Sequence, residues 1–295
     1  MKQTERLFNE LMYQSIPKLD NYLIEEVSPH KYYYEDSYGV AIEEFYRLAG
    51  FTSHEFGKVK TQFKGERMKI CSVSSSSRLC FLKYGLEMAK KNRLNEEARL
   101  EKHLVNGTIK RDKEWEKENQ NDAQLDAFDG ETFYECKCQE IFEDKGPLSK
   151  SYARYMNKYF NTNLGESNFV KGKIHAKASE FGITFEEDKE YTKALFDIKQ
   201  LVTHLCAIIK YSKNKNKQLT LKYVFFKPAK SLINNNGDVK AVYEELEKEI
   251  YAIQKSKLIE GAKKYGVSFA YEWVYVDSLE FGQDPKEMTK ELQED

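Results

Sequence analysis

Along the C-terminal half of the chain, the spacing of hydrophobic residues alternates between that of a helix and that of a strand. A helix that is apolar over much of its surface, and therefore buried, is predicted for residues 194–211, which include Leu201, Leu205 and Ile208. Strands are predicted for residues 218–226 and 267–276, with a long helix over residues 239–265 between them. This alternation of strand and helix is typical of an α/β domain.

The N-terminal part has a different pattern. Apolar residues such as Leu7, Leu11 and Ile16 recur at helix-like spacing over residues 1–65, and Gly50 is a stop signal. We therefore expect a helical N-terminal accessory region over residues 1–65 and one α/β domain over residues 66–295. Within that domain, residues 68–73 are expected to form a strand and residues 79–104 a long helix. Residues 110–121 are almost all charged or amide, which favours an exposed segment.

A hairpin is predicted where residues 122–128 and 131–142 flank an Asp-Gly pair. If Asp129 and Gly130 form a two-residue turn, Asp126 lies opposite Phe133, and opposite residues share a face of the sheet. The polar face then has Asp122, Gln124, Asp126, Glu135, Lys137 and Gln139, and the apolar face has Ala123, Leu125, Ala127, Tyr134, Cys136 and Cys138. Asp126 and Glu135 become diagonal neighbours, roughly 7–8 Å apart at the backbone, so both carboxylates can reach one cation.

Two carboxylates and a lysine at this spacing suit Mg²⁺-dependent hydrolysis of phosphodiester bonds. Asp126 and Glu135 offer hard oxygen ligands to a metal ion that keeps several of its waters. The metal acidifies a water and neutralises charge on the phosphate, while Lys137 orients that water and offsets charge in the transition state. The alternative is an ordinary hairpin with one polar face, on which Lys137 and Glu135 form a solvated ion pair worth little.

Asp126, followed after eight residues by Glu135-Cys136-Lys137, resembles the D…(D/E)xK signature of the PD-(D/E)xK nuclease superfamily. The wider run Ala-Gln-Leu-Asp-Ala, with Tyr-Glu-Cys-Lys-Cys-Gln-Glu after it, is similar to a group of bacterial restriction endonucleases. The resemblance covers roughly residues 85–230 and rests on a short motif. Leu125 stands where the family pattern has a proline.

The resemblance implies both a fold and a set of roles. The fold is an α/β restriction endonuclease-like αβββαβ core, with a mixed central sheet flanked by helices and a helical N-terminal elaboration, and residues 66–295 form the catalytic domain. Asp126 and Glu135 would bind Mg²⁺, for which Mn²⁺ can substitute. The main-chain carbonyl of Cys136 would be a further ligand, and Lys137 would be catalytic.

Two further sets of candidates lie on predicted helices. Several relatives take a metal-binding carboxylate from the first core helix, where Glu97 and Glu101 stand four residues apart. Glu101 is the preferred candidate, with a solvated helix glutamate as the alternative. Gln200 and His204 stand one turn apart on the apolar helix, which is similar to the Gln-x-x-x-Tyr helix of some exonuclease-like members. A hydrogen-bonded core pair is the alternative interpretation.

Charge is balanced overall and segregated along the chain. The chain has 47 basic and 48 acidic residues, which excludes a uniformly basic protein. Residues 210–230 nevertheless hold seven lysines and no acid, whereas residues 1–56 and 277–295 are acidic. Lys213, Lys215 and Lys217, together with Arg78 after a serine run, are candidate phosphate contacts for double-stranded DNA. A solvated lysine-rich face is the alternative.

Cysteine usage and apolar runs indicate the compartment. Five cysteines without a ladder of pairs favour a reducing environment over a disulfide framework. Cys136 and Cys138 lack a second closely spaced ligand pair, so core positions are favoured over a zinc site. The first six residues lack the apolar stretch of a signal peptide, and no apolar run approaches the roughly 18 residues of a membrane span. We therefore expect a soluble, cytoplasmic protein with no membrane partner.

The leading hypothesis from the sequence is a Mg²⁺-dependent DNA endonuclease of restriction type. The alternatives are a DNA repair or exonuclease-like member of the superfamily, a non-catalytic nucleic-acid-binding module on a decayed nuclease fold, and a protein-interaction domain. Many restriction-like enzymes cut both strands as dimers, so the analogy allows a homodimer. Replacing Glu135 or Lys137 with alanine is expected to abolish cleavage and leave the fold intact.

Overall fold

The computed structural model of this 295-residue chain describes most of its C-terminal half and selected parts of its N-terminal half. The described residues are 2–15, 24–28, 31–34, 75–77, 79–80, 83–84, 99–103, 123–143, 145–148, 150–162 and 164–279. The predicted strand over 68–73, the charged segment 110–121, Arg78 and Glu97 lie outside them.

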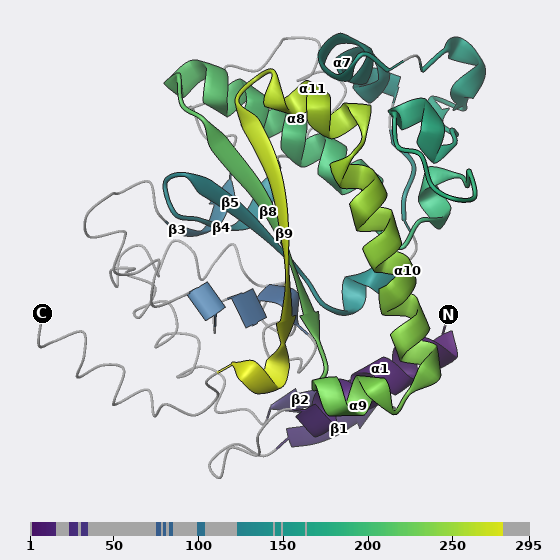
Figure 1. Ribbon diagram of the computed structural model, residues 1–295, viewed down its shortest axis with the longest axis vertical. Helices are drawn as coiled ribbons and strands as arrows, with labels where there is room; N and C mark the ends of the chain where they lie inside the picture. The colour runs from purple at the N-terminus through teal and green to yellow at the C-terminus, as the bar shows by residue number, and fades with distance from the viewer. Residues whose placement is uncertain are drawn as a thin grey trace, which may run out of the picture.

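A five-stranded mixed sheet is the centre of the described structure (Figure 1). Its strands, in spatial order, are β3 (Arg99–His103), β4 (Gln124–Phe128), β5 (Thr132–Lys137), β8 (Leu219–Lys227) and β9 (Val267–Tyr275). The pairs β3–β4 and β4–β5 are antiparallel, whereas β5–β8 and β8–β9 are parallel. The protein is therefore a mixed α/β structure.

Helices make the crossovers that the parallel strands require. The main ones are α7 (Lys150–Phe160), α8 (Ile198–Lys215), α10 (Gly237–Gln254) and α11 (Lys257–Lys263). Both α7 and α8 come between β5 and β8 in the chain, and α10 and α11 come between β8 and β9. Figure 1 shows α8, α10 and α11 on the same side of the sheet, so this side is covered by helices. None of the described helices is long and apolar enough to span a membrane.

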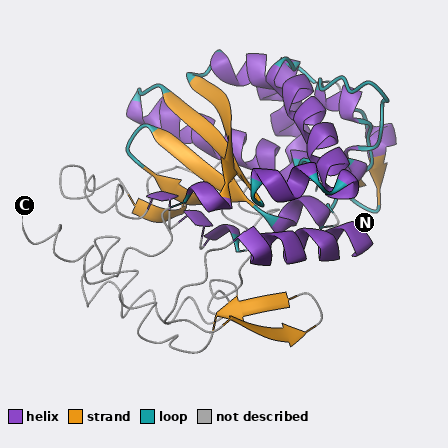
Figure 2. Cartoon of the chain, turned by 60° about the horizontal axis from the view of Figure 1, so that its bottom comes forward, coloured by secondary structure: helices purple, strands orange, loops and turns teal. Residues whose placement is uncertain are grey.

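Shorter elements complete the described part. They are α1 (Lys2–Ser15), β1 (Ile24–Ser28), β2 (Lys31–Tyr34), η1 (Gln139–Phe142), η2 (Glu166–Asn168), β6 (Phe169–Val170), β7 (Lys173–Ile174), η3 (Ala178–Phe181), η4 (Tyr191–Lys193), α9 (Lys230–Asn234) and η5 (Val276–Ser278), where η marks a 3₁₀ helix. The strands β1 and β2 form an antiparallel sheet of their own, at the bottom of Figure 2.

Helix α1 packs into the same core as the sheet. The ring of Phe8 lies 5.1 Å from that of Phe142 and 6.5 Å from that of Tyr243, between ring centroids. At the end of the helix, the Oγ of Ser15 accepts a hydrogen bond from the main-chain N of Ala229 at 2.6 Å. This first helix of the N-terminal region therefore packs against the α/β body.

The periodicity predicts the C-terminal elements correctly and several N-terminal ones wrongly. Strands β8 and β9 and most of α8 are confirmed. The long helix over 239–265 is two helices, because the Oγ of Ser256 accepts from Ile259 N and begins α11. The helical prediction is wrong for residues 24–28 and 31–34, and for 99–103 at the end of the predicted helix 79–104, since all three segments are strands.

Candidate functional site

The predicted hairpin forms, with its turn one residue later than expected. The main-chain N of Asp129 donates to the carbonyl of Thr132, so Gly130 and Glu131 are the two loop residues. Gly130 has a φ of 101°, which glycine adopts without strain, whereas Asp129 has no positive φ. The Oδ1 of Asp129 accepts from the main-chain N of both Glu131 and Thr132, which keeps this aspartate at the end of β4.

This turn shifts the register by two residues and brings the two carboxylates closer along the sheet. Ala127 pairs with Tyr134, so the next position along puts Asp126 opposite Glu135 instead of on its diagonal. An even shift leaves every residue on its predicted face. The six residues of the predicted apolar face are all buried: Ala123, Leu125, Ala127, Tyr134, Cys136 and Cys138.

The predicted polar face is covered in part by α8, and Glu135 is buried there, whereas Gln124 is exposed and Asp126 and Lys137 are partly buried. Phe133 stacks on Phe128 with centroids 4.0 Å apart, and the edge of Tyr211 from α8 contacts both rings. Glu135, two residues further along β5, is only 4% exposed. The solvated hairpin face that the sequence allows as an alternative is therefore excluded for Glu135.

Glu135 and Lys137 form a buried ion pair on β5. The Nζ of Lys137 lies 2.5 Å from Oε1 of Glu135, and the two side chains are 11% and 5% exposed. Burial raises the pKa of Glu135, and the nearby ammonium of Lys137 only partly offsets this. Burial acts to lower the pKa of Lys137, but the carboxylates of Glu135, Glu140 and Asp126 outweigh it and raise that pKa above its usual range.

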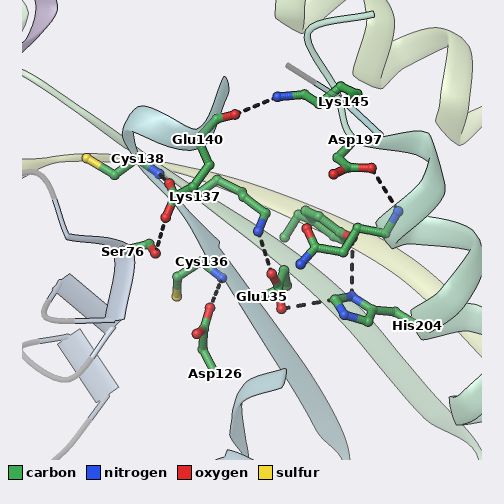
Figure 3. A network of polar contacts seen from close by, with 12 residues as sticks. Ser76, Asp126, Glu135, Cys136, Lys137, Cys138, Glu140, Lys145, Asp197 and His204 are labelled. Atoms are coloured by element: carbon green, nitrogen blue, oxygen red, sulfur yellow. Dashed lines mark hydrogen bonds and ion pairs between the residues drawn. The ribbon is translucent and has the colours of Figure 1, made fainter. Parts of the chain in front are cut away.

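Asp126 approaches this pair from β4. Its Oδ2 accepts a hydrogen bond from the main-chain N of Cys136 at 2.6 Å, so the aspartate spans the two strands (Figure 3). Burial, followed by the negative charge of Glu135, raises the pKa of Asp126 well above its ordinary value. A carboxylate whose pKa is raised by burial and by a neighbouring negative charge would be stabilised in its charged form by a nearby cation.

His204 and Tyr223 close the site from α8 and β8. The Nδ1 of His204 lies 3.3 Å from the hydroxyl of Tyr223 and 3.9 Å from Oε2 of Glu135. Gln200, one turn earlier on α8, lines the neighbouring pocket and donates its main-chain N to Oδ1 of Asp197. The predicted core pair of Gln200 and His204 is thus replaced by a contact between His204 and Tyr223.

A pocket of about 150 Å³ opens beside Lys137. Its polar lining is Lys137, Glu140, Glu143, Lys145, Asp197 and Gln200, and its apolar lining is Ile141, Leu195, Phe196, Tyr223 and Phe225. Asp197 comes from the N-cap of α8 and Lys145 from the segment after η1. The pocket therefore lies where β5 ends and α8 begins.

Sequence reasoning missed three of these polar residues. The carboxylate of Glu140 accepts from the hydroxyl of Ser76 and from the main-chain N of Cys138, which leaves both of its oxygens engaged (Figure 3). Lys145 donates to the carbonyls of Glu140 and Glu143 at 2.5 and 2.9 Å. Of the three, only Asp197 could have been recognised from the sequence, because an aspartate directly before an apolar helical run is a typical N-cap.

The donor set of Asp126 and Glu135 fits a hard divalent cation. Both offer carboxylate oxygens, and the negative charge of Glu135 that raises the pKa of Asp126 would be offset by a cation. In the part of the chain that the structure describes, no group of three or more His, Cys, Asp or Glu side chains could hold a metal ion. Mg²⁺ would therefore use two carboxylates here and complete its shell with water or main-chain oxygen, as this ion commonly does.

Glu101 is on β3 and not on a helix, which corrects the prediction. Leu100 pairs with Ala127 and Lys102 with Leu125, so the register puts Glu101 opposite Asp126. The candidate carboxylate thus belongs to the strand next to β4. Strand pairing places it there, and helical spacing does not predict this.

The lysine run 213–217 lies at the other end of α8 from the pocket, about 20 Å along the helix from Gln200. The Nζ of Lys217 donates to the carbonyl of Gly130 at 2.5 Å, and Lys215 lies over the ring of Tyr211. Lys213 lies 4.1 Å from the ring centroid of Tyr265. Lysines in the last turn also complement the helix dipole. These side chains therefore have structural contacts and do not border the candidate site.

The described cysteines are core residues. Cys80, Cys136, Cys138 and Cys206 are free and buried. Burial raises the pKa of Cys136 and Cys138 well above the usual value, so neither is prone to form the thiolate that zinc requires.

Comparison of the chain with protein-family models, with curated proteins and with solved structures finds no match.

Proposed function

We propose that this protein is a Mg²⁺-dependent DNA endonuclease of restriction type. The observation that carries the proposal is the meeting of Asp126, Glu135 and Lys137 on two adjacent strands, beside a pocket at the end of β5. These three side chains come from the motif that resembles the PD-(D/E)xK signature. Because these side chains are largely removed from solvent, they are not an ordinary solvated cluster of surface charges.

Each residue has a distinct role in the proposal. Asp126 and Glu135 hold the metal ion, with the carbonyl of Cys136 as a further oxygen ligand and Glu101 as a candidate from β3. The ion, when bound, acidifies a water and neutralises charge on the phosphate. Lys137, which lines the pocket, would orient that water and offset the negative charge of the transition state.

The fold supports the same proposal. Three consecutive antiparallel neighbours, β3, β4 and β5, are followed by α8 and the parallel strand β8. This order agrees with the βββαβ portion of the core that the resemblance implies. We include residues 66–295 in the proposed catalytic domain, with double-stranded DNA as the substrate, Mn²⁺ as a substitute ion and a homodimer as the assembly that would cut both strands.

Cleavage of supercoiled plasmid and linear duplex DNA by the purified chain tests the proposal, in Mg²⁺, Mn²⁺ or EDTA. We expect metal-dependent cleavage that is lost in Glu135→Gln and Lys137→Met. Glu272→Gln is the matched control, since Glu272 is also a sheet carboxylate in ion pairs, with Lys83 and Lys222 at 2.9 and 2.6 Å. Metal-dependent cleavage that persists in both site variants would refute the assignment.

A non-catalytic nucleic-acid-binding module is the second candidate. The observation that favours it is the ion pair itself, since Lys137 already neutralises Glu135 without any metal. This candidate predicts DNA binding with the same affinity in Mg²⁺ and EDTA, and no cleavage in either. A filter-binding or fluorescence-anisotropy titration beside the cleavage assay separates the two.

A further inference from the structure

His204 is a buried polar side chain that faces the candidate site from α8. It is only 2% exposed, among helix residues that are mostly apolar and buried. A buried imidazole is costly unless its nitrogens have partners. Its surroundings therefore indicate what it does.

The ring contacts two neighbouring strands. Glu135 of β5 and Tyr223 of β8 are partners in the parallel register, and both reach Nδ1 of His204, at 3.9 Å and 3.3 Å (Figure 3 labels Glu135 and His204). The shorter distance is within reach of a hydrogen bond, whereas the longer one is not. His204 thus bonds Tyr223 and borders Glu135.

The surroundings of His204 oppose a positive charge on its ring. Burial, followed by the positive charge of Lys137, lowers the pKa of His204 to about 3. The tautomer of the ring decides whether Nδ1 donates to the hydroxyl of Tyr223 or accepts from it. In either tautomer, the 3.9 Å between Nδ1 of His204 and Oε2 of Glu135 is too long for a hydrogen bond.

The two oxygens of Glu135 consequently have different surroundings. Oε1 is bound by Lys137 at 2.5 Å, whereas Oε2 lies 3.9 Å from the ring of His204 with no hydrogen bond from it. Packing restrains the carboxylate on that side without using up its lone pairs. This is the arrangement that a ligand to a metal ion requires.

We propose that His204 is a positioning residue, which together with Tyr223 holds the carboxylate of Glu135 in the orientation that binds a divalent cation. The inference rests on the proposed function, because it concerns the same metal. Groups that orient metal ligands commonly change metal affinity 10- to 100-fold when they are removed. His204 acts through Glu135 and need not touch the substrate.

Binding of MnCl₂ to the purified full chain tests the inference without any cleavage. Free Mn²⁺ is measured by electron paramagnetic resonance, and the rise of the thermal midpoint with added Mn²⁺ is the second readout. We expect His204→Phe to raise the Kd for Mn²⁺ about tenfold or more. His204→Asn, which can keep an acceptor near the place of Nδ1, is expected to stay within about threefold of wild type.

Ile208→Val is the matched control. Ile208 is one turn further along α8 and fully buried, and its truncation costs about 1 kcal/mol without touching Glu135. The control should lower the thermal midpoint and leave the Kd for Mn²⁺ unchanged. A loss of Mn²⁺ affinity in His204→Phe alone therefore separates positioning from stability.

The outcomes distinguish the two proposals. If wild type binds Mn²⁺ but His204→Phe binds it equally well with a lower thermal midpoint, His204 is a packing residue and the inference is overturned. The same holds if His204→Asn loses as much affinity as His204→Phe. If wild type neither binds Mn²⁺ nor cleaves DNA, the proposed function fails and the inference fails with it.

Discussion

Lys137→Met should destabilise the protein far more than an exposed lysine change. Methionine keeps the length and apolar volume of the side chain and removes its charge. Glu135, with a side chain only 5% exposed, then loses the ammonium group that lies 2.5 Å from its Oε1. Removing one partner of a buried ion pair typically costs about 3–5 kcal/mol, because the other charge is left uncompensated. That is a large share of the roughly 5–15 kcal/mol by which domains are stable.

The cost should also depend on pH. The pKa of Glu135 is already raised by burial, and the loss of Lys137 raises it further. The folded variant therefore holds a proton that the unfolded chain releases near pH 4.3, and stability falls as pH rises from there through the folded pKa. The destabilisation by Lys137→Met is thus smallest below about pH 4 and largest near neutrality.

Urea unfolding monitored by circular dichroism measures both effects. Lys222→Met is the reference, since Lys222 is 28% exposed and its partner Glu272 keeps Lys83. We expect about 1 kcal/mol or less for the reference and about 3 kcal/mol or more for Lys137→Met at pH 7.5. Equal losses in the two variants, or a loss for Lys137→Met that is the same at pH 5 and pH 8, would refute the reasoning.

Three other changes probe the described core. Lys227 is 8% exposed and lies 3.6 Å from the ring centroid of Trp273, and burial lowers its pKa to about 8. Because the folded state releases this proton at lower pH than the unfolded chain, wild type should gain stability between about pH 8 and 10.5. Parallel pH profiles of wild type and Lys227→Met in urea unfolding would contradict this. Phe133→Ala should lower the free energy of unfolding by about 3–5 kcal/mol, because the ring is fully buried against Tyr211; a loss below about 1 kcal/mol would argue against that packing. Asn216 has a φ of 49° at the end of α8, so Asn216→Gly should change the thermal midpoint little, whereas Asn216→Val should lower it by several degrees; the reverse order would exclude the left-handed conformation.

The hairpin illustrates what a sequence pattern predicts well. The alternation of polar and apolar residues gave the faces of β4 and β5 correctly, and the position of the turn was wrong by one residue. The turn is one residue later because the carboxylate of Asp129 accepts from the main-chain N of Glu131 and Thr132, which holds Asp129 directly after β4. A local side-chain contact of this kind does not appear in hydrophobic periodicity.

Other errors have different physical causes. Glu101 was expected on a helix, but it pairs into the sheet beside β4, and such long-range pairing overrides local helical spacing. The prediction that alanine at 135 or 137 leaves the fold intact does not follow from the structure either, because both side chains are buried in one ion pair. The cleavage test therefore depends chiefly on Glu135→Gln, which keeps the shape of the side chain, and the loss of activity in Lys137→Met is read together with its expected cost of about 3 kcal/mol or more in stability.

The sequence by itself determined which residues of the hairpin lie side by side on one face, because side chains alternate along a strand and an even shift of register preserves that alternation. It also predicted the positions of the helix α8 and of the two strands β8 and β9. Only the tertiary structure decided that α8 covers the polar face. That covering buries Glu135 and removes much of Asp126 and Lys137 from water, and this desolvation shifts the pKa values of a motif that could have been a solvated ion pair.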